Sequence, residues 1–185
     1  MGLNLGIFGG AFDPPHISHT LACLYALETQ EIDRILVIPC YRHPLEKKTS
    51  PFVHRLAMTR LAMDCLKPRV EVSDMEADRE GPSYTIDTLR ILNKSYPEAN
   101  LCLLVGSDIL EETHEWKEFN EVKQLAQLVF LPRPRPEKNN SSPAFTLPDI
   151  SSTEIRERLK NGKNITPFIS RKVLEYIQYH KLYTS

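Results

Sequence analysis

Two histidines follow a glycine pair near the start of the chain, with residue types and spacing that suit phosphate chemistry. Gly9 and Gly10 close an apolar stretch, and His16 and His19 open a helical pattern. Residues three apart share one face of a helix, so both imidazoles are expected to reach the same anion. Glycines let backbone N–H groups approach a ligand, and a helix N-terminus favours negative charge. We therefore predict a site where protonated imidazoles stabilise charge on phosphate oxygens.

The spelling of this loop excludes two other phosphate-binding motifs. Residues 6–10 read Gly-Ile-Phe-Gly-Gly, which is neither Gly-x-x-x-x-Gly-Lys-Ser/Thr nor Gly-x-Gly-x-x-Gly. In addition, no acidic residue follows the second predicted strand at a position suited to binding a ribose. An NAD-dependent oxidoreductase is therefore disfavoured.

A second candidate anion site lies near the C-terminus. Residues 151–156 read Ser-Ser-Thr-Glu-Ile-Arg, and the serine and glutamate have the spacing of a capping box. Taken alone, this spacing predicts a well-capped helix. Phosphate binding at the same place is compatible with such a cap, because a free helix N-terminus binds anions.

Both motifs resemble signatures of the nucleotidyltransferase superfamily related to class I aminoacyl-tRNA synthetases. Residues 9–19 are similar to its pattern Gly-Gly-Thr-Phe-Asp-Pro-x-His-x-Gly-His, with Ala11 in place of the threonine and Ser18 in place of the last glycine. Residues 150–156 are similar to its C-terminal signature, which holds the β- and γ-phosphates of ATP. The resemblance implies that His16 and His19 are the catalytic residues. It also implies that ATP is bound by Gly9, Gly10, Ala11, Phe12, Ser151, Ser152, Thr153 and Arg156.

The middle of the chain resembles the bacterial nicotinate mononucleotide adenylyltransferases in particular. The similarity is carried by Pro-Ser-Tyr-Thr at 82–85, by Gly-Ser-Asp at 106–108 and by Trp116, whose charged neighbours favour an edge position with one ring face exposed. In that family the turn binds the nicotinate carboxylate, the tryptophan stacks on the pyridine ring and the aspartate contacts the ribose. The acceptor site that the resemblance implies consists of Ser83, Tyr84, Thr85, Gly106, Asp108, Trp116 and Arg133.

The resemblance covers residues 5–183 and implies an enzyme of NAD biosynthesis. It would transfer AMP from ATP to nicotinate mononucleotide, with Mg²⁺ carried mainly by ATP and no metal site in the protein. Residues 39–42 read Pro-Cys-Tyr-Arg where the family commonly has Pro-Pro-His-Lys, so the basic loop 42–48 receives no assigned role. Two alternatives stay open. One is another acceptor, nicotinamide mononucleotide or phosphopantetheine, and the other is a nucleotide-binding regulatory module without turnover.

Composition favours an ordinary globular protein. The chain has 185 residues, 41% of them hydrophobic, and a net charge of −1, which argues against nucleic-acid or membrane partners. No apolar stretch is long enough to span a membrane and no signal-peptide pattern is present, so we expect a cytoplasmic protein. The oligomeric state stays open, a homo-oligomer included. Four widely spaced cysteines favour reduced thiols over zinc binding or disulfides: Cys23, Cys40, Cys65 and Cys102.

Strands and helices must position these motifs. Apolar runs alternate with helical patterns along the chain, which predicts an α/β fold. We expect a Rossmann-like, doubly wound parallel sheet with strands near 3–8, 33–39, 69–72, 101–105 and 128–131. Residues 1–185 are expected to form one nucleotidyltransferase domain, with a core over 1–150 and a helical subdomain over 151–185. In that subdomain one helix should stop at Gly162 and the last should start at residues 166–167. Five prolines in 132–149 predict a long surface loop, mobile or acting as a lid.

Overall fold

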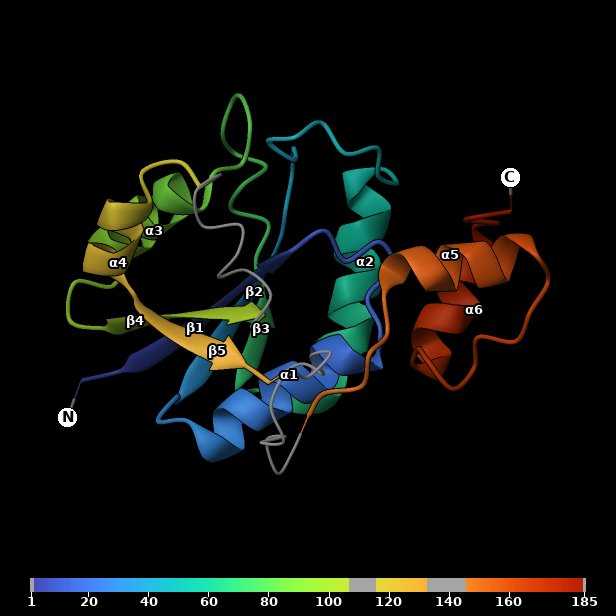
Figure 1. The fold of residues 1–185 in the computed structure, drawn as a ribbon, viewed down its shortest axis with the longest axis horizontal. Coiled ribbons are helices and arrows are strands. Elements are labelled where there is room, and N and C mark those ends of the chain that lie inside the picture. Colours follow the sequence, from blue (N-terminus) through green and yellow to red (C-terminus); the bar gives the residue numbers. More distant parts are fainter. Residues whose placement is uncertain (1, 107–115, 133–145, 185) are drawn as a thin grey trace, which may run out of the picture.

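The structure, a computed structural model, describes residues 2–106, 116–132 and 146–184. Within these ranges five strands form one parallel sheet in the order β3-β2-β1-β4-β5 (Figure 1). The strands are β1 (Asn4–Gly10), β2 (Arg34–Pro39), β3 (Val70–Val72), β4 (Asn100–Gly106) and β5 (Gln127–Leu131). The strand order reverses at β1, which lies between β2 and β4, and ligands of doubly wound sheets bind beside the carboxyl ends of the strands at such a point. The predicted fold class is confirmed.

Helices cover both faces of this sheet. They are α1 (Ile17–Thr29), α2 (Phe52–Met63), α3 (Thr85–Ser95) and α4 (Phe119–Leu125), with a short 3₁₀ helix η1 (Asp64–Leu66) after α2. Strand side chains alternate between the two faces: in β4, Leu103 packs into the cluster of α3 and α4, and Leu104 into the cluster of α1. Figure 1 shows α1 and the α3/α4 pair on opposite sides of the sheet.

Two further helices lie at one end of the molecule, beside α2 (Figure 1). They are α5 (Ser152–Lys160) and α6 (Arg171–Tyr179). A separate apolar cluster joins them to α2 through Met58, Ala62, Ile155, Ile165, Ile169, Val173 and Ile177. The predicted cap of α5 is confirmed, because Ser151 Oγ accepts the N–H of Glu154 at 3.1 Å. Gly162, at φ 62°, follows the C-cap residue Asn161 of this helix, so the helix stops there as predicted.

Two helix starts differ from the predictions. The last helix begins at Arg171 rather than at residues 166–167, because Ser170 Oγ caps it by accepting the N–H of Val173 at 3.3 Å. Residues 166–169 form a turn instead. The pattern of residues 116–126, rich in Glu and Lys, also predicts a helix, but this helix begins only at Phe119, after Glu118 in a left-handed conformation at φ 53°.

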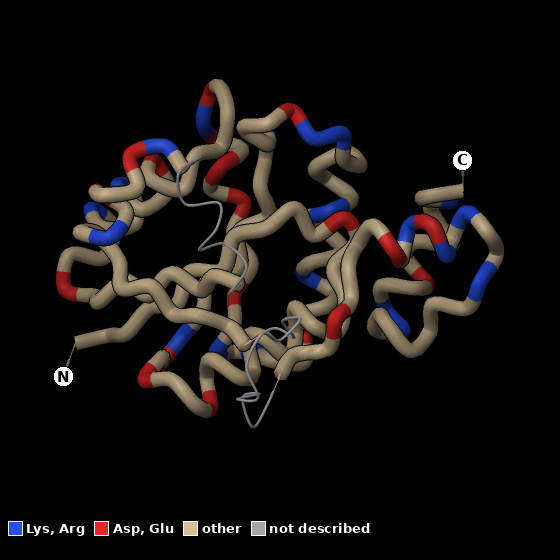
Figure 2. The backbone as a smooth tube through the Cα atoms, viewed as in Figure 1, with Lys and Arg blue, Asp and Glu red and all other residues tan. Residues whose placement is uncertain are grey.

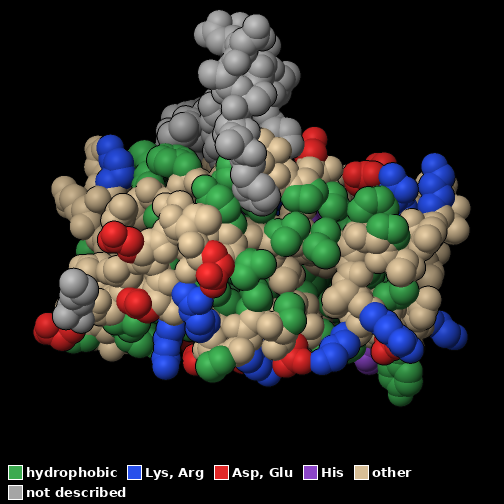
Figure 3. All heavy atoms as spheres, turned by 90° about the horizontal axis from the view of Figure 1, so that it is seen from below, with side chains coloured by type: hydrophobic (Ala, Val, Ile, Leu, Met, Phe, Trp, Pro, Cys, Tyr) green, Lys and Arg blue, Asp and Glu red, His purple; other side chains and the backbone are tan. Residues whose placement is uncertain are grey.

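Charges of both signs are spread over the molecule. Figure 2 shows basic and acidic residues interspersed along helices and loops, and the face in Figure 3 mixes both with hydrophobic side chains. Across the described ranges, no helix has the length and apolarity that crossing a membrane requires. All four cysteines are free thiols, two of them buried.

Candidate active site

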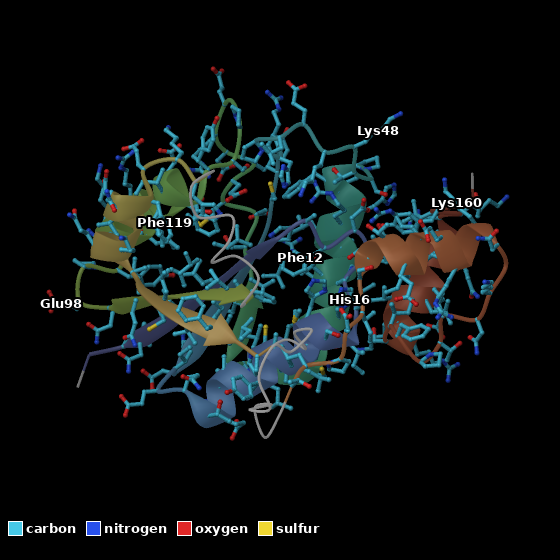
Figure 4. All side chains as sticks on the ribbon, viewed as in Figure 1. Phe12, His16, Lys48, Glu98, Phe119 and Lys160 are labelled. Atoms are coloured by element: carbon cyan, nitrogen blue, oxygen red, sulfur yellow. The ribbon has the colours of Figure 1, made fainter. Side chains whose placement is uncertain are left out.

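The loop after β1 contains Phe12, whose backbone has a positive φ of 49° and which is 1% exposed. Its ring packs edge-on against Phe8 and His19, with centroid distances of 5.6 and 4.9 Å. Gly10, the last residue of β1, lies against this ring, and a Cβ there would come within 3.1 Å of it, so any larger residue would push the ring aside by a few tenths of an ångström. Phe12 therefore supports His19 from within the core (Figure 4).

The two histidines form a stacked pair at the start of α1. Their ring centroids are 3.7 Å apart with planes inclined by 26°, and the His16 backbone N–H donates to His19 Nδ1 at 3.1 Å. Because Nδ1 accepts a hydrogen bond, a neutral His19 ring carries its proton on Nε2 and is a donor there. His16 is buried at 4% exposure and underlies this ring.

A cavity of about 430 Å³ opens at the carboxyl ends of β1 and β4, and its size is typical of small-molecule sites. It brings together sequence-predicted residues from four separate stretches of the chain. These are Gly9, Gly10, Ala11, His19, Ser83, Tyr84, Thr85, Gly106 and Trp116. His16, Phe12 and residues 151–156 are not part of its wall. Asp108 and Arg133 lie outside the described residues.

The predicted acceptor turn is held by the loop that follows β2. The Ser83 backbone N–H donates to the Arg42 carbonyl at 2.8 Å, and the Arg42 N–H donates to Ser83 Oγ at 3.2 Å. Tyr84 is the N-cap residue of α3, so the turn leads directly into that helix N-terminus. Trp116 also lines the cavity, is half-buried, and packs edge-on against Phe119 at a centroid distance of 5.9 Å.

The N-terminus of α5 contacts the loop that precedes the histidines. Ser152 Oγ donates to the Pro14 carbonyl at 2.8 Å, and Arg156 Nη1 donates to the Asp13 carbonyl at 2.6 Å. Arg156 Nη2 donates to Thr153 Oγ1 at 3.1 Å. The two motifs near opposite ends of the sequence therefore lie side by side. Figure 4 shows His16 close to α5.

Asp13 is a structural junction in this arrangement. Its carboxylate is 3% exposed and accepts hydrogen bonds from the Tyr183 hydroxyl at 2.6 Å and from the Ser50 backbone N–H at 3.1 Å. Burial raises the pKa of Tyr183, and the bond to Asp13 raises it further, so the phenol stays a donor. Asp13 thus connects the glycine loop to residues near the C-terminus.

Arg55 is a site residue that the sequence reasoning missed. Its side chain comes from α2 and is 2% exposed. Nη1 donates to the carbonyls of Ala11 and Cys40 at 2.9 and 2.8 Å, and Nε donates to that of Ser50 at 2.9 Å. One guanidinium therefore fixes the loops after β1 and β2 relative to each other. One feature of the sequence could have indicated it. Arg55 lies three residues after Phe52, on the apolar face of the helix that the pattern after Pro51 predicts.

The cavity wall also carries charge that the motifs did not reveal. Glu76, 8% exposed, accepts from the Thr88 hydroxyl at 2.8 Å and from the Tyr41 backbone N–H at 3.2 Å. The basic loop reaches the cavity through His43 and Lys47. Burial lowers the pKa of His43, with further lowering from Lys47 and then Arg55.

Comparisons with known proteins agree with this geometry. A model of the cytidylyltransferase-like family matches residues 7–158. The chain belongs to this family. A protein of Thermus thermophilus named "probable nicotinate-nucleotide adenylyltransferase" is 40% identical over 98% of this chain and 100% of its own length. One of the same name from Anaeromyxobacter dehalogenans is 37% identical, covering 98% of this chain and 97% of the relative. The family resemblance of the motifs is confirmed.

Solved structures of the family share the fold. Nicotinic acid mononucleotide adenylyltransferase of Plasmodium falciparum, complexed with NaAD, superposes with a TM-score of 0.82 at 21% identity, covering 98% of this chain and 97% of that one. The same enzyme complexed with APC gives a TM-score of 0.80 at 20% identity, with the same coverage of both chains. At such identities these likenesses establish the common fold.

Cys40 gives a first test of the cavity wall. Burial raises the pKa of this thiol to about 11, with the Glu76 carboxylate adding to the rise. At pH 8 only about one Cys40 in a thousand is then a thiolate, the reactive form. Iodoacetamide at pH 8 should label the exposed Cys65 first, with Cys40 labelling accelerating about ten-fold per pH unit towards pH 11. Peptide mapping by mass spectrometry measures both rates, and equal labelling at pH 8 would contradict the half-buried position of Cys40 beside the Glu76 carboxylate.

Proposed function

We propose that this chain is a nicotinate-nucleotide adenylyltransferase of NAD biosynthesis. It transfers AMP from ATP to nicotinate mononucleotide and forms nicotinate adenine dinucleotide and pyrophosphate. One observation carries the proposal: a single cavity is walled by the glycine loop with His19 and also by residues 83–85 and Trp116. Both nucleotides would meet there. The names of relatives at 37% and 40% identity support the same activity.

The chemistry needs no nucleophilic side chain. A 5′-phosphate oxygen of the acceptor forms a bond to the α-phosphorus of ATP, and the bond from that phosphorus to the bridging oxygen of the β-phosphate breaks. Pyrophosphate leaves with the electron pair. Because both reactants already carry the reacting oxygens, the protein contributes position and charge stabilisation.

His19 is proposed to stabilise the charge that develops around the α-phosphate. Its Nδ1 accepts a hydrogen bond from the His16 backbone N–H, so the ring donates its proton from Nε2. Gly9 adds an open backbone surface in the cavity wall, since a Cβ built on it meets no atom within 4 Å. His16 acts mainly by stacking on His19 and fixing its orientation.

The N-terminus of α5 is proposed to bind the outer phosphates of ATP. Ser151 to Thr153 present the free N–H groups of its first turn, where negative charge is favoured. Arg156 is 31% exposed and lies one turn further along. The contacts of Ser152 and Arg156 with residues 13–14 keep this helix beside the loop that leads to His19.

Mg²⁺ is proposed to enter as part of the ATP substrate. The Asp13 carboxylate already accepts two hydrogen bonds, from Tyr183 and Ser50, and is buried. Within the described ranges, no three histidine, cysteine, aspartate or glutamate side chains are grouped to hold a metal ion. These observations support a Mg²⁺ ion that is held by the phosphate oxygens of ATP. The ion would neutralise phosphate charge during the transfer.

The mixed surface charge of Figure 2 supports two narrower proposals. We propose that neither nucleic acid nor a membrane surface is a partner, and that the enzyme works in the cytoplasm. A chain with net charge −1, whose described residues carry both signs interspersed along the backbone, has no general electrostatic attraction for either polyanion.

An acceptor panel tests the function. The purified chain is incubated with ATP, Mg²⁺ and one acceptor at a time: nicotinate mononucleotide, nicotinamide mononucleotide or phosphopantetheine. Pyrophosphate release should be fastest with nicotinate mononucleotide. A faster reaction with phosphopantetheine would replace the proposed acceptor, and ATP binding without any acceptor-dependent pyrophosphate would show a regulatory module instead.

Trp116 should govern acceptor affinity. Trp116→Ala is expected to raise KM for nicotinate mononucleotide about ten-fold, because a cationic pyridinium loses its aromatic platform. KM for ATP should stay within about two-fold. Steady-state kinetics with each substrate varied in turn measures both values, and Trp116→Phe, which keeps an aromatic face, should recover most of the affinity. Equal increases in the two KM values would remove the stacking role.

A further inference from the structure

Lys117 directly follows Trp116 and lines the same cavity. Its ammonium lies 4.7 Å from the centroid of the Tyr84 ring. Nζ is also 3.5 Å from Asp87 Oδ2 and 3.7 Å from Glu118 Oε1, with the side chain 42% exposed. These contacts from α3 and the start of α4 hold the ammonium beside Tyr84 and next to Trp116, both of which line the cavity with it.

The surroundings of this ammonium are acidic. Asp87 is in the first turn of α3, and Glu118 and Glu121 lie at the start of α4. Arg90 pairs with all three carboxylates, and Lys117 with two of them. Within this group of described residues, three negative charges are therefore balanced by two positive ones, leaving −1. Without Lys117 the local balance would be −2, beside a cavity that must accept an anion.

We propose that Lys117 makes this site select a pyridine nucleotide carrying a carboxylate over one carrying a neutral carboxamide. The inference rests on the proposed function, in which Trp116 and residues 83–85 bind the pyridine end of the acceptor. Backbone N–H groups at the N-terminus of α3 can donate to the oxygen of either substituent. The two substituents differ in charge, so a fixed cation nearby distinguishes them.

Lys117 acts in two ways on the acid form. Its ammonium attracts the carboxylate across the cavity end, and it offsets the repulsion from Asp87 and Glu118. The carboxamide form feels neither effect. For a half-exposed charge several ångströms away, such a difference is worth about three- to ten-fold in selectivity.

The test compares Lys117→Gln with a matched control on α4, the helix that begins two residues after Lys117. Lys123 on α4 makes a similar cation–ring contact, 5.2 Å from the Phe119 centroid, but does not line the cavity. For the unmutated chain, Lys117→Gln, Lys117→Arg and Lys123→Gln, kcat/KM is measured with nicotinate and nicotinamide mononucleotides at saturating ATP and Mg²⁺. The readout is the acid-to-amide ratio.

Lys117→Gln should lower this ratio about three- to ten-fold by weakening only the acid reaction. Lys117→Arg, which keeps the charge, and Lys123→Gln should both retain the ratio of the unmutated chain. An unchanged ratio in Lys117→Gln, or equal losses for both acceptors, would overturn the role of Lys117 while leaving the proposed function intact. Absence of transfer to either mononucleotide by the unmutated chain would overturn the function and this inference with it.

Discussion

His19→Ala is expected to lower kcat for adenylyl transfer by about two to three orders of magnitude, the usual effect of deleting one preorganised donor at a charged transition state. The ring lines the cavity, and its Nδ1 is held by the His16 N–H, so the donor position is fixed before substrate arrives. Kinetics at saturating ATP and acceptor measures the loss. Circular dichroism should show an unchanged fold.

A second histidine serves as the control for His19. His54 lies on α2, bonds Tyr176 through Nδ1 at 3.0 Å, and does not line the cavity. His54→Ala should leave kcat within about two-fold, because it removes no group from the phosphate site. If His19→Ala also kept kcat within this range, the imidazole would have no part in charge stabilisation.

Arg55→Met is expected to destabilise the fold by about 3–5 kcal/mol, because part-buried carbonyl groups lose a buried, charged donor that nothing replaces. Those carbonyls belong to Ala11, Cys40 and Ser50, so the loops that wall the cavity should loosen together. Urea unfolding measures the stability, and kcat/KM should fall for ATP and acceptor alike. Arg55→Lys keeps the charge but cannot span the three carbonyls, and it should give an intermediate loss.

Arg60 provides the matched control on the same helix. It pairs with Asp74 at 3.1 Å, and both side chains are more than half exposed. Arg60→Met should change the free energy of unfolding by less than about 1 kcal/mol, as for surface ion pairs in general. If Arg55→Met had an effect this small, the guanidinium would not hold the loops after β1 and β2 together as its contacts indicate.

Periodicity and motif spelling predicted the parts of this molecule that depend on local sequence. Buried apolar runs predicted the strands, and Ser151 was correctly expected to cap a helix. The two anion-binding motifs were expected to belong to one site, and the loop at residues 13–14 does contact α5. Local patterns suffice there because each element's hydrophobic face and cap lie within a few residues of one another.

Contacts between distant segments could not be predicted in this way. Ser18, which replaces the glycine of the family pattern, is buried and donates to the Pro148 carbonyl at 2.9 Å, a partner 130 residues away. Of the two histidines only His19 lines the cavity, and this difference depends on three-dimensional packing, because Phe12 and the His16 N–H orient the His19 ring. The role of Arg55 could not be predicted from the sequence for a related reason. Its partners are backbone carbonyls, which every residue has, so no residue type marks them.

The most direct test of adenylyl transfer at this cavity follows the phosphates of ATP separately. The unmutated chain is incubated with Mg²⁺, nicotinate mononucleotide and ATP labelled at either the α- or the γ-phosphate, and products are separated by chromatography. Adenylyl transfer predicts that the α-label appears in a dinucleotide and the γ-label in an equal amount of pyrophosphate. A γ-label on the acceptor, or no acceptor-dependent pyrophosphate, would contradict it.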